Sequence, residues 1–452
     1  MTIKQTLSRE EVIQIVERNL GKTLGELNYN KVDTKGSIGQ FIEEELFDYA
    51  PNSKSEKDFK DADLELKVTP YKMNKNGSFS SKERLVLNII NYMTEHKKDF
   101  STSSFWQKNS ELIILFYEHL YDQEKKSFPI THYTIYDYPP KDLKIICNDW
   151  QIIRDKILRG EAHLISEADT MYLAACTKGA NRHSTRRQPF SSIPAKQRAY
   201  SFKSSFMTQL LRQVMFQPKK ESLVDESLLE EKSFETIVLE KLAAFKGRSV
   251  KSLASEFGLN EKAKSINYMV LSRILGIEGN IKDTEEFQKA NIVPKTIRLE
   301  EDGSIREHMS FPSFKFTELI KESWESSNLR ELLETTKFMF VVFQKMGKDY
   351  RYVKSVFWNM PISDLEIHVF EVWQHTFETI DNGNIVKEIT KSGIRKTNFI
   401  GSQRNLVAHV RPHAQNAKDV YPLPTPDKLT GLEFYTKQCF WLNRGYILNI
   451  IK

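Results

Sequence analysis

The 452-residue sequence contains few cysteines and no long apolar run. Its three cysteines, Cys147, Cys176 and Cys439, lie far apart and form neither a C-x2-C pair nor a local Cys/His cluster, which excludes a disulfide framework and a zinc motif. No stretch reaches the roughly 18 apolar residues of a transmembrane helix, and the first residues, MTIKQTLSREEV, lack a signal-peptide core. We therefore expect a protein of the reducing cytoplasm that does not enter a membrane.

A large charge excess is also missing, because 66 Lys and Arg residues against 60 Asp and Glu residues leave a net charge of +6. One window departs from this balance. Residues 178–220 contain no Asp or Glu and ten basic residues: Lys178, Arg182, Arg186, Arg187, Lys196, Arg198, Lys203, Arg212, Lys219 and Lys220. A run of charge is often only a solvated face. Here polar and aromatic residues lie between the charges, which favours phosphate contacts and base reading, and hence a nucleic acid partner.

The charge reverses abruptly after this window. The only basic residue in the segment 221–235 is Lys232, and its acidic residues are Glu221, Asp225, Glu226, Glu230, Glu231 and Glu235. Such a change predicts a linker or a domain edge. The interpretation gives three parts: a first domain at 1–220, an acidic linker at 221–235 and a second domain at 236–452.

The two predicted domains resemble each other in sequence. Identical residues recur 228 positions apart and in the same order: Ser37 and Ser265, Ile38 and Ile266, Phe59 and Phe287, Ala62 and Ala290, Lys67 and Lys295. Further along, the apolar run LIILFY at 112–117 has a counterpart, FMFVVF, at 338–343. A period this long excludes a solenoid of short repeats and predicts two globular copies of one fold.

Within each copy, the apolar periodicity predicts both helices and strands. Residues 9–20 and 38–46 have helical apolar spacing. Residues 64–69 alternate with a period of two, and the apolar runs 112–117 and 143–147 are typical of central strands. The predicted fold class is α/β (α+β), with a mixed central sheet flanked by helices.

The segment DFKDADLELK, which begins at Asp58, carries the chemistry. Strand alternation places Glu65 and Lys67 on one face, and Asp58 precedes a turn that can bring it back to Glu65. Two carboxylates and a substrate phosphate suit a Mg²⁺ ion, while an adjacent lysine can orient a water nucleophile. The pattern predicts metal-assisted phosphodiester hydrolysis, although the same spacing also occurs on exposed polar edge strands. Glu43 offers a third oxygen, but periodicity does not choose between it and the two glutamates that follow it.

The second copy lacks this set of side chains. At the same spacing, the counterparts of Asp58, Glu65, Lys67 and Glu43 are Glu286, Val293, Lys295 and Leu271. Valine and leucine cannot bind a cation. We therefore expect the second copy to keep the scaffold and to bind its partner without cutting it.

Several motifs resemble a known family, that of the mismatch-repair endonuclease MutH and the Sau-type restriction endonucleases. They are GKTLGEL (21–27), KGSIG (35–39) followed by Glu43, DFKDADLELK (58–67), SSKERLVLNIINY (80–92), CTKGAN (176–181) and HVRPH (409–413). The resemblance implies two tandem restriction-endonuclease-like domains of the PD-(D/E)xK, MutH-like type. It also implies a type II restriction endonuclease that cuts double-stranded DNA at GATC, before the G, with Mg²⁺ as cofactor.

For the active site, the resemblance implies Asp58 and Glu65 as metal ligands and Lys67 as the catalytic lysine. It further implies Glu43 as a supporting carboxylate and Lys108, just before the LIILFY strand, as another active-site lysine. The alternative for Lys108 is an ordinary lysine at a strand edge. The sequence departs from the family at one position, because a lysine precedes Asp58 where the family has a proline, and hydrolysis does not require that proline.

For DNA binding, the resemblance implies loops late in each domain that enter the major groove, where every base pair shows a distinct pattern of donors and acceptors. In the first domain, the candidates for base reading are Thr177, Lys178, Asn181 and Arg182, and those for phosphate contacts are Lys196, Arg198, Lys203 and Ser204. In the second domain, Arg411 and His413 take the comparable place. The alternative there is a zinc site made by His409 and His413, which lacks a third ligand nearby.

Relatives with two such domains imply that the second domain binds another copy of the site and promotes cleavage in the first. We therefore expect two GATC sites to be bound by one protein, which stays a monomer because the duplication supplies both binding surfaces. A cognate methyltransferase is expected as a functional partner, not as a bound subunit. Two alternatives are a MutH-like mismatch-repair nicking endonuclease, which the second domain argues against, and a DNA-binding regulator that does not cleave, which the intact Asp58, Glu65 and Lys67 argue against.

Overall fold

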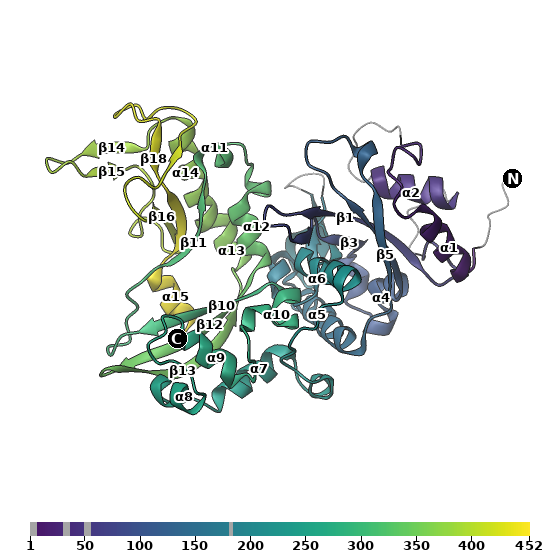
Figure 1. Ribbon diagram of the computed structural model, residues 1–452, viewed down its shortest axis with the longest axis horizontal. Helices are drawn as coiled ribbons and strands as arrows, with labels where there is room; N and C mark the ends of the chain where they lie inside the picture. Colours follow the sequence, from purple (N-terminus) through teal and green to yellow (C-terminus); the bar gives the residue numbers. More distant parts are fainter. Residues whose placement is uncertain (1–6, 30–36, 49–55, 180–183) are drawn as a thin grey trace. The chain divides into compact units, whose positions relative to one another are not determined.

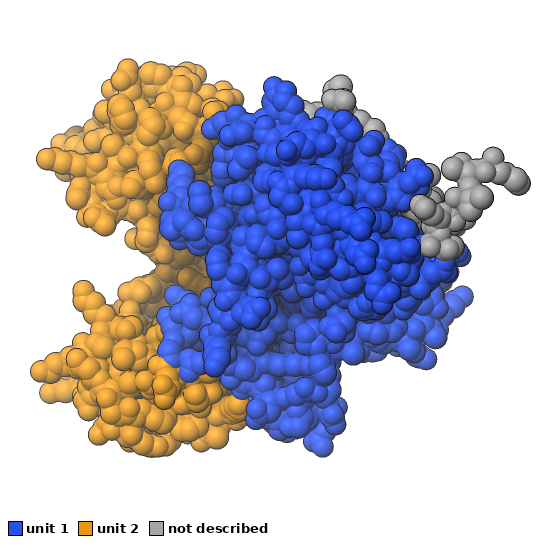
Figure 2. Space-filling model, turned by 45° about the vertical axis from the view of Figure 1, so that its right-hand side comes forward, with its two compact units in different colours: residues 1–238, 279–292 blue, residues 239–278, 293–452 orange. Residues whose placement is uncertain are grey.

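The computed structural model describes residues 7–29, 37–48, 56–179 and 184–452. The chain forms two compact units, one made of residues 1–238 and 279–292 and the other of residues 239–278 and 293–452 (Figures 1 and 2). Among the described residues, no helix combines the length and the apolar content needed to cross a bilayer.

The central sheet of the first unit is mixed, as predicted. Its strands are ordered β2-β1-β4-β5, with bounds Phe79–Ser81 (β2), Glu65–Met73 (β1), Leu112–Glu118 (β4) and Ile130–Tyr136 (β5). β1 and β4 run parallel, with Glu65 opposite Leu112, whereas β5 runs antiparallel to β4. The predicted run LIILFY forms β4, and its first five residues are buried because the strand lies in the middle of the sheet.

Two amphipathic helices pack together beside this sheet (Figure 1). α1 (Arg9–Asn19) begins with a capping box between Ser8 and Glu11, and α2 (Ser37–Phe47) contacts β1. Their apolar sides and one side of the sheet share a core that contains Val12, Val16, Phe41, Ile42, Leu64, Leu66, Ile113 and Leu115. The helical spacing of apolar residues in α1 and α2 and the period-two alternation in β1 place these side chains in the core.

The predicted strand at 143–147 is wrong, because these residues lie inside helix α5 (Pro140–Leu158). The buried side chains of α5 include Ile145, Ile146, Asp149, Trp150 and Ile153, at spacings of three and four that define one helical face. Proline in the first turn favours the start of a helix. An apolar run of five residues does not distinguish a strand from such a face.

A second sheet of the first unit is antiparallel and has the order β3-β9-β6. Its strands are β3 (Leu85–Ile89), β9 (Arg198–Phe202) and β6 (Leu173–Thr177). The hairpin β7–β8 (Thr185–Gln188 and Ser191–Lys196) follows β6, and α6 (Ser204–Phe216) follows β9. Short helices α3 (Tyr92–Glu95) and α4 (Ser104–Asn109) connect β3 to β4.

The second unit repeats this topology, which supports the predicted duplication. One sheet has the order β10-β12-β13 (Ile292–Leu299, Lys337–Met346 and Asp349–Trp358), and the other β11-β19-β16 (Met309–Phe314, Gln438–Leu442 and Ala408–Pro412). The register recurs too, because Leu85 and Leu173 both lie opposite Phe202 in the first unit, while Met309 and Ala408 both lie opposite Leu442 in the second. The restriction-endonuclease-like fold is therefore present twice, in tandem.

The remaining elements of the C-terminal half surround these sheets. The hairpins are β14–β15 (Val386–Ile389 and Arg395–Thr397) and β17–β18 (Val420–Pro422 and Phe434–Thr436). The helices are α7 (Phe234–Ala243), α8 (Val250–Glu256), α9 (Ile266–Ile274), α11 (Phe316–Leu319), α12 (Asn328–Thr335), α13 (Ile362–Asp364), α14 (Phe370–Asp381) and α15 (Arg444–Ile450). A large apolar core that includes Phe316, Phe340, Trp373 and Phe440 fills the unit.

The division between the units differs from the predicted boundaries in two places. The acidic segment 221–235 belongs to the first unit, where Leu223 and Val224 are buried and the Lys144 Nζ lies 2.8 Å from the Glu230 carboxylate. Residues 279–292, which include helix α10 (Glu285–Ala290), also belong to the first unit, where α10 packs against α6 (Figure 1). Burial of apolar side chains, which net charge does not report, sets these boundaries.

Candidate active site

A tight turn brings Asp58 to the start of β1. Phe59 and Leu64 exchange backbone hydrogen bonds of 3.0 and 3.1 Å, so the chain reverses within six residues. Asp63 has a positive φ of 53°, and the buried Lys57 ammonium donates to the Asp63 carbonyl at 2.9 Å. Lys57, the residue before Asp58, therefore holds the turn closed.

The turn places Asp58 beside Glu65, and each carboxylate accepts a hydrogen bond from a backbone N–H at or next to the other residue. The Asp58 N–H donates to Glu65 Oε2 at 3.1 Å, and the Leu66 N–H donates to Asp58 Oδ2 at 3.1 Å. The Glu65 side chain is 1% exposed. A carboxylate this deeply buried requires hydrogen bonds or opposite charges around it.

Two lysines supply these opposite charges. The Lys67 Nζ donates to Glu65 Oε1, and the Lys108 Nζ lies 3.4 Å from the same oxygen. Lys67 is on β1, two residues after Glu65, whereas Lys108 is on α4, which ends just before β4. Because β1 and β4 are parallel and Glu65 lies opposite Leu112, the end of α4 reaches the start of β1.

Glu43 faces the same cluster from helix α2. Burial raises the pKa of its carboxyl group, the nearby Glu65 raises it further, and the charges of Lys67 and Lys108 lower it. Glu43 is partly buried, whereas Glu45 on the opposite side of the helix turn is exposed. The structure thus distinguishes Glu43 from Glu45, which the sequence alone did not.

The cluster holds more negative charge than its lysines neutralise. Burial, followed by the charge of Glu65, raises the pKa of Asp58 to about 7, although Lys67 and Lys108 oppose the shift. Three carboxylates face two ammonium groups here, and a cation would relieve the repulsion between Asp58 and Glu65. Among the described residues, no three His, Cys, Asp or Glu side chains already form a ready-made metal site. The donor set still fits Mg²⁺, which is commonly held by one or two carboxylates together with waters and substrate phosphate.

The corresponding positions of the second copy have other roles. Val293 lies on β10 and Leu271 is buried in α9. Glu286, the counterpart of Asp58, is fully buried in the first unit, where it accepts hydrogen bonds from the Lys141 ammonium, the Ser222 hydroxyl and the Leu223 N–H. The paired carboxylates of the first copy are therefore not repeated.

The predicted DNA-reading segment follows strand β6. Thr177 and Lys178 are exposed at its end, and the Lys178 N–H is fixed by the Gln197 carbonyl at 2.8 Å. Lys196 is partly exposed and Ser204 is exposed at the start of α6. The predicted contacts at Asn181 and Arg182 lie outside the described residues.

Two of the predicted phosphate contacts need correction, because Arg198 and Lys203 point into the protein. Arg198 is 1% exposed and its guanidinium donates to the Ala175 carbonyl at 2.6 Å. Lys203 is 3% exposed and its ammonium donates to the carbonyls of Thr170 and Ala290, at 2.5 and 3.3 Å. Both side chains donate to backbone carbonyls inside the protein, which a count of basic residues cannot reveal.

The hairpin β7–β8 carries basic residues that were not among the predicted contacts. Arg186 and Arg187 are exposed on β7, and Phe190 and Ile193 are exposed near the turn. Arg186 donates to the Gln197 side chain at 3.0 Å. Both arginines belong to the basic window 178–220, so the run of basic residues was the available signal.

In the second unit, the HVRPH motif forms strand β16 and its end. Arg411 is exposed and its guanidinium carbon lies 4.9 Å from the centre of the Trp441 ring, which also contacts His413 at 5.4 Å. His409 is buried, and its Nδ1 is hydrogen-bonded to the Asn443 side chain at 2.5 Å. Burial lowers the pKa of His409 to about 4. In the described part of the chain no three His, Cys, Asp or Glu side chains form a cluster, so no third ligand for the zinc alternative is found there.

Similarity to known proteins agrees with this geometry. Residues 47–149 match the family model described as DNA mismatch repair enzyme MutH. The chain is 37% identical over 479 residues to the type II restriction enzyme Sau3AI of Staphylococcus aureus, and the match covers 98% of each protein. The chain belongs to the family of MutH and Sau-type restriction endonucleases. Asp58, Glu65, Lys67 and Lys108 all lie within the MutH match.

Membership of this family confirms several predictions made from the sequence. The resemblance itself, the restriction-endonuclease-like fold class and the type II site-specific endonuclease activity are shown by the two matches. Enzymes of the MutH and Sau-type family act on DNA. The mismatch-repair model covers only residues 47–149, whereas the match to the restriction enzyme spans both units.

Proposed function

We propose that the first unit hydrolyses double-stranded DNA at GATC, before the G, with Mg²⁺ as cofactor, leaving four-base 5′ overhangs. One observation carries the proposal: Lys67 and Lys108 both reach Glu65 Oε1, next to Asp58, in a buried cluster at the start of a central strand. Nucleases of this kind need carboxylates for a cation and an ammonium group beside them. These groups come from a turn, a strand and a helix.

Each side chain has a distinct task in the proposed reaction. Asp58 and Glu65 would hold Mg²⁺, which when bound polarises the phosphate and makes a water more acidic. The Lys67 ammonium orients the attacking water and stabilises the negative charge that develops on it, while Lys108 adds positive charge where the phosphate becomes more negative. Glu43 supports the lysines from α2. Because the site is largely buried, these charges act more strongly than they would in water.

The proposal assigns DNA binding to both units. In the first, Thr177 and Lys178 read bases in the major groove, while Lys196 and Ser204 contact phosphates. In the second, Arg411 and His413 contact another GATC site without cutting it, since Val293 replaces the metal ligand. Two sites on one DNA molecule raise the local concentration of the second site.

The central experiment compares Lys67→Ala with the parent protein. With Mg²⁺ and a GATC duplex, the parent is expected to produce four-base 5′ overhangs, whereas Lys67→Ala keeps its DNA affinity and loses at least about 100-fold in cleavage rate. Lys72→Ala is the matched control, because Lys72 lies on the same strand β1 in the part that pairs with β2. Equal cleavage by Lys67→Ala and Lys72→Ala would refute the assigned site.

The products separate this proposal from its alternatives. A MutH-like nicking enzyme would relax a supercoiled plasmid without linearising it, and a non-cleaving regulator would bind the duplex and leave it intact.

The second unit is tested with two plasmids, one with a single GATC site and one with two, at equal site concentration. Faster cutting of the two-site plasmid is expected, and equal rates would contradict a role for a second bound site.

A further inference from the structure

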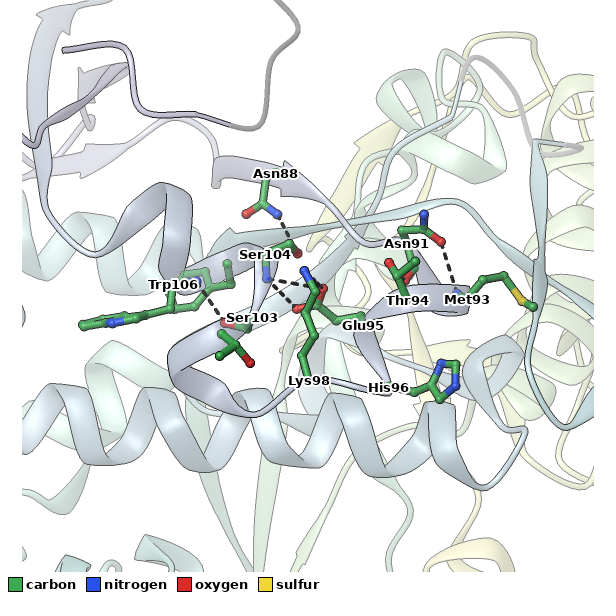
Figure 3. A network of polar contacts seen from close by, with 12 residues as sticks. Asn88, Asn91, Met93, Thr94, Glu95, His96, Lys98, Ser103, Ser104 and Trp106 are labelled. Carbon is green, nitrogen blue, oxygen red and sulfur yellow. Dashed lines mark hydrogen bonds and ion pairs between the residues drawn. The ribbon is translucent and has the colours of Figure 1, made fainter. Parts of the chain in front are cut away.

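A buried carboxylate outside the proposed active site fastens helix α4. Glu95, the last residue of α3, is fully buried. Its oxygens accept the Ser104 N–H at 3.1 and 3.4 Å (Figure 3). Ser104 is the first residue of α4, so the negative charge of Glu95 lies at the end of the helix where N–H groups are unsatisfied.

Other elements of the first unit hold the same carboxylate. The Trp150 indole N–H on α5 and the Tyr200 hydroxyl on β9 each donate to Glu95 Oε1 at 3.3 Å. The Lys98 Nζ lies 3.8 Å from Oε2. Glu95 therefore ties the start of α4 to α5 and to the central strand of the sheet β3-β9-β6.

Helix α4 is also anchored to strand β3. Asn88 on β3 donates from its amide to the Ser104 hydroxyl at 3.2 Å (Figure 3), and the amide of Asn109 at the end of α4 donates to the Asn88 oxygen at 2.9 Å. A six-residue helix makes few internal hydrogen bonds, so these contacts decide its position. Lys108 lies in its last turn and contacts Glu65.

We propose that Glu95 is a positioning residue for cleavage: it fixes α4, and through α4 the Lys108 ammonium, relative to the sheet that bears the DNA-reading segment. The inference rests on the proposed function. β9 pairs with β6, and Lys178 follows β6, so one buried carboxylate links the sheet next to the predicted DNA contacts to the helix that carries Lys108. Lys108 lies on a short helix, and Glu95 keeps it aligned without contacting substrate.

Removal of the Glu95 charge should therefore slow cleavage without weakening DNA binding. In Glu95→Gln the amide oxygen can still accept the Ser104, Trp150 and Tyr200 donors in the place of Oε1. The amide nitrogen, however, puts a donor in the place of Oε2, next to the Ser104 N–H and the Lys98 ammonium, and the negative charge at the start of α4 is lost, so the start of α4 is held less firmly. A misplacement on the order of 1 Å costs up to about 100-fold in rate, so we expect a 10- to 100-fold lower single-turnover rate at saturating DNA and Mg²⁺. The dissociation constant for DNA is expected to stay within about twofold.

Asp149→Asn is the matched control. Asp149 is another fully buried carboxylate, but it accepts the N–H groups of Met171, Tyr172 and Leu173, at 2.7, 2.7 and 2.9 Å, before strand β6. Asp149→Asn removes the charge of a buried carboxylate that three backbone N–H groups hold, without touching α4. Both variants are expected to lower the melting temperature, but only Glu95→Gln should lower the rate per folded molecule by tenfold or more.

The deciding measurement is a double-mutant cycle with Lys108→Ala. If Glu95 acts through Lys108, Glu95→Gln costs little more than about twofold in the Lys108→Ala background, whereas the small effect of Asp149→Asn is the same in both backgrounds. Tyr200→Phe removes one donor to Glu95 and keeps the ring. It should lower the cleavage rate less than Glu95→Gln and should also have little effect in the Lys108→Ala background, so it replaces Glu95→Gln in the cycle if that variant does not fold.

Three results would overturn the proposal. Multiplicative losses of Glu95→Gln and Lys108→Ala would show that they act independently, an unchanged rate in Glu95→Gln would show no positioning role, and an unchanged rate in Lys108→Ala would remove the residue through which Glu95 acts. These outcomes are distinct from failure of the proposed function, which is read from Lys67→Ala alone.

Discussion

The counterpart of Asp58 in the second copy gives a sharp test of how the duplicated site has changed. Glu286 is fully buried, and its carboxylate accepts the Ser222 hydroxyl at 2.8 Å, the Leu223 N–H at 3.2 Å and the Lys141 ammonium. In Glu286→Ala, the buried Leu223 N–H loses its acceptor, which costs about 1–3 kcal/mol. Lys141 loses one of its partners but keeps the Ser222 hydroxyl and the Glu285 carboxylate, and its side chain is 18% exposed and can recruit water, so we expect less than the roughly 3–5 kcal/mol of a fully buried pair.

These terms together predict a loss of about 3 kcal/mol in the free energy of unfolding of the first unit. For a unit of this size, each kcal/mol lowers the melting temperature by roughly 2–4 °C, so the shift should be roughly 6–12 °C. The measurement is calorimetric melting together with urea unfolding followed by tryptophan fluorescence. Glu285→Ala is the control, because Glu285 is 33% exposed, pairs with Lys289 at 2.7 Å and should cost no more than about 1 kcal/mol. Equal losses for the two variants would refute the reasoning.

Three further predictions follow from single residues. Burial lowers the pKa of His409 to about 4, so the stability that the neutral ring contributes is complete above the ordinary value of 6.5 and is lost as the pH falls toward 4. The free energy of unfolding of the second unit should therefore fall by up to roughly 3 kcal/mol over this window, and His409→Gln should remove this pH dependence. Gly160→Ala should cost more than about 1 kcal/mol in thermal unfolding, because Gly160 has φ +71° and an added Cβ would lie 2.6 Å from the Phe190 carbonyl oxygen. Lys196→Ala should weaken DNA binding and reduce the slope of log affinity against log salt by about 1, measured by fluorescence anisotropy.

Each of these predictions has its own control. His413→Gln changes an exposed histidine of the same motif and should leave the pH dependence of unfolding intact. Gly77→Ala shares a positive φ of +79° but would meet no atom within 4 Å, so a loss as large as that of Gly160→Ala would argue against the steric clash. Lys262→Ala removes an exposed charge of the second unit, and a salt slope lowered as much as by Lys196→Ala would contradict a local contact.

The core of the candidate site could be predicted from the sequence because it depends on local geometry. A period of two fixes which residues of β1 share a face, and a six-residue turn leaves Asp58 little choice but to lie beside Glu65. Helical spacing likewise located α1 and α2. Lys108 needed the family resemblance, since its approach to Glu65 depends on the parallel register of β1 and β4.

Features that depend on distant partners were missed. Residues 143–147 form part of a helix because α5 buries one face, and the sequence shows only the apolar run. Arg198 and Lys203 count as basic residues in the sequence, yet both donate to backbone carbonyls inside the protein. The partners of Glu95, at positions 104, 150 and 200, are too far apart in sequence for any periodicity to connect them.

Helix α10 determines where the two copies can be separated. In sequence order it belongs to the rear copy, yet the Lys289 Nζ lies 2.8 Å from both oxygens of Asp142, and the Ser205 hydroxyl donates to the Lys289 carbonyl at 2.7 Å. If the gene were divided at the acidic segment, the N-terminal product would lack helix α10, which belongs to its unit, and the C-terminal product would carry α10 without the residues it packs against. The two copies are thus no longer separable modules, and a chimera between relatives has to carry residues 279–292 along with the N-terminal half.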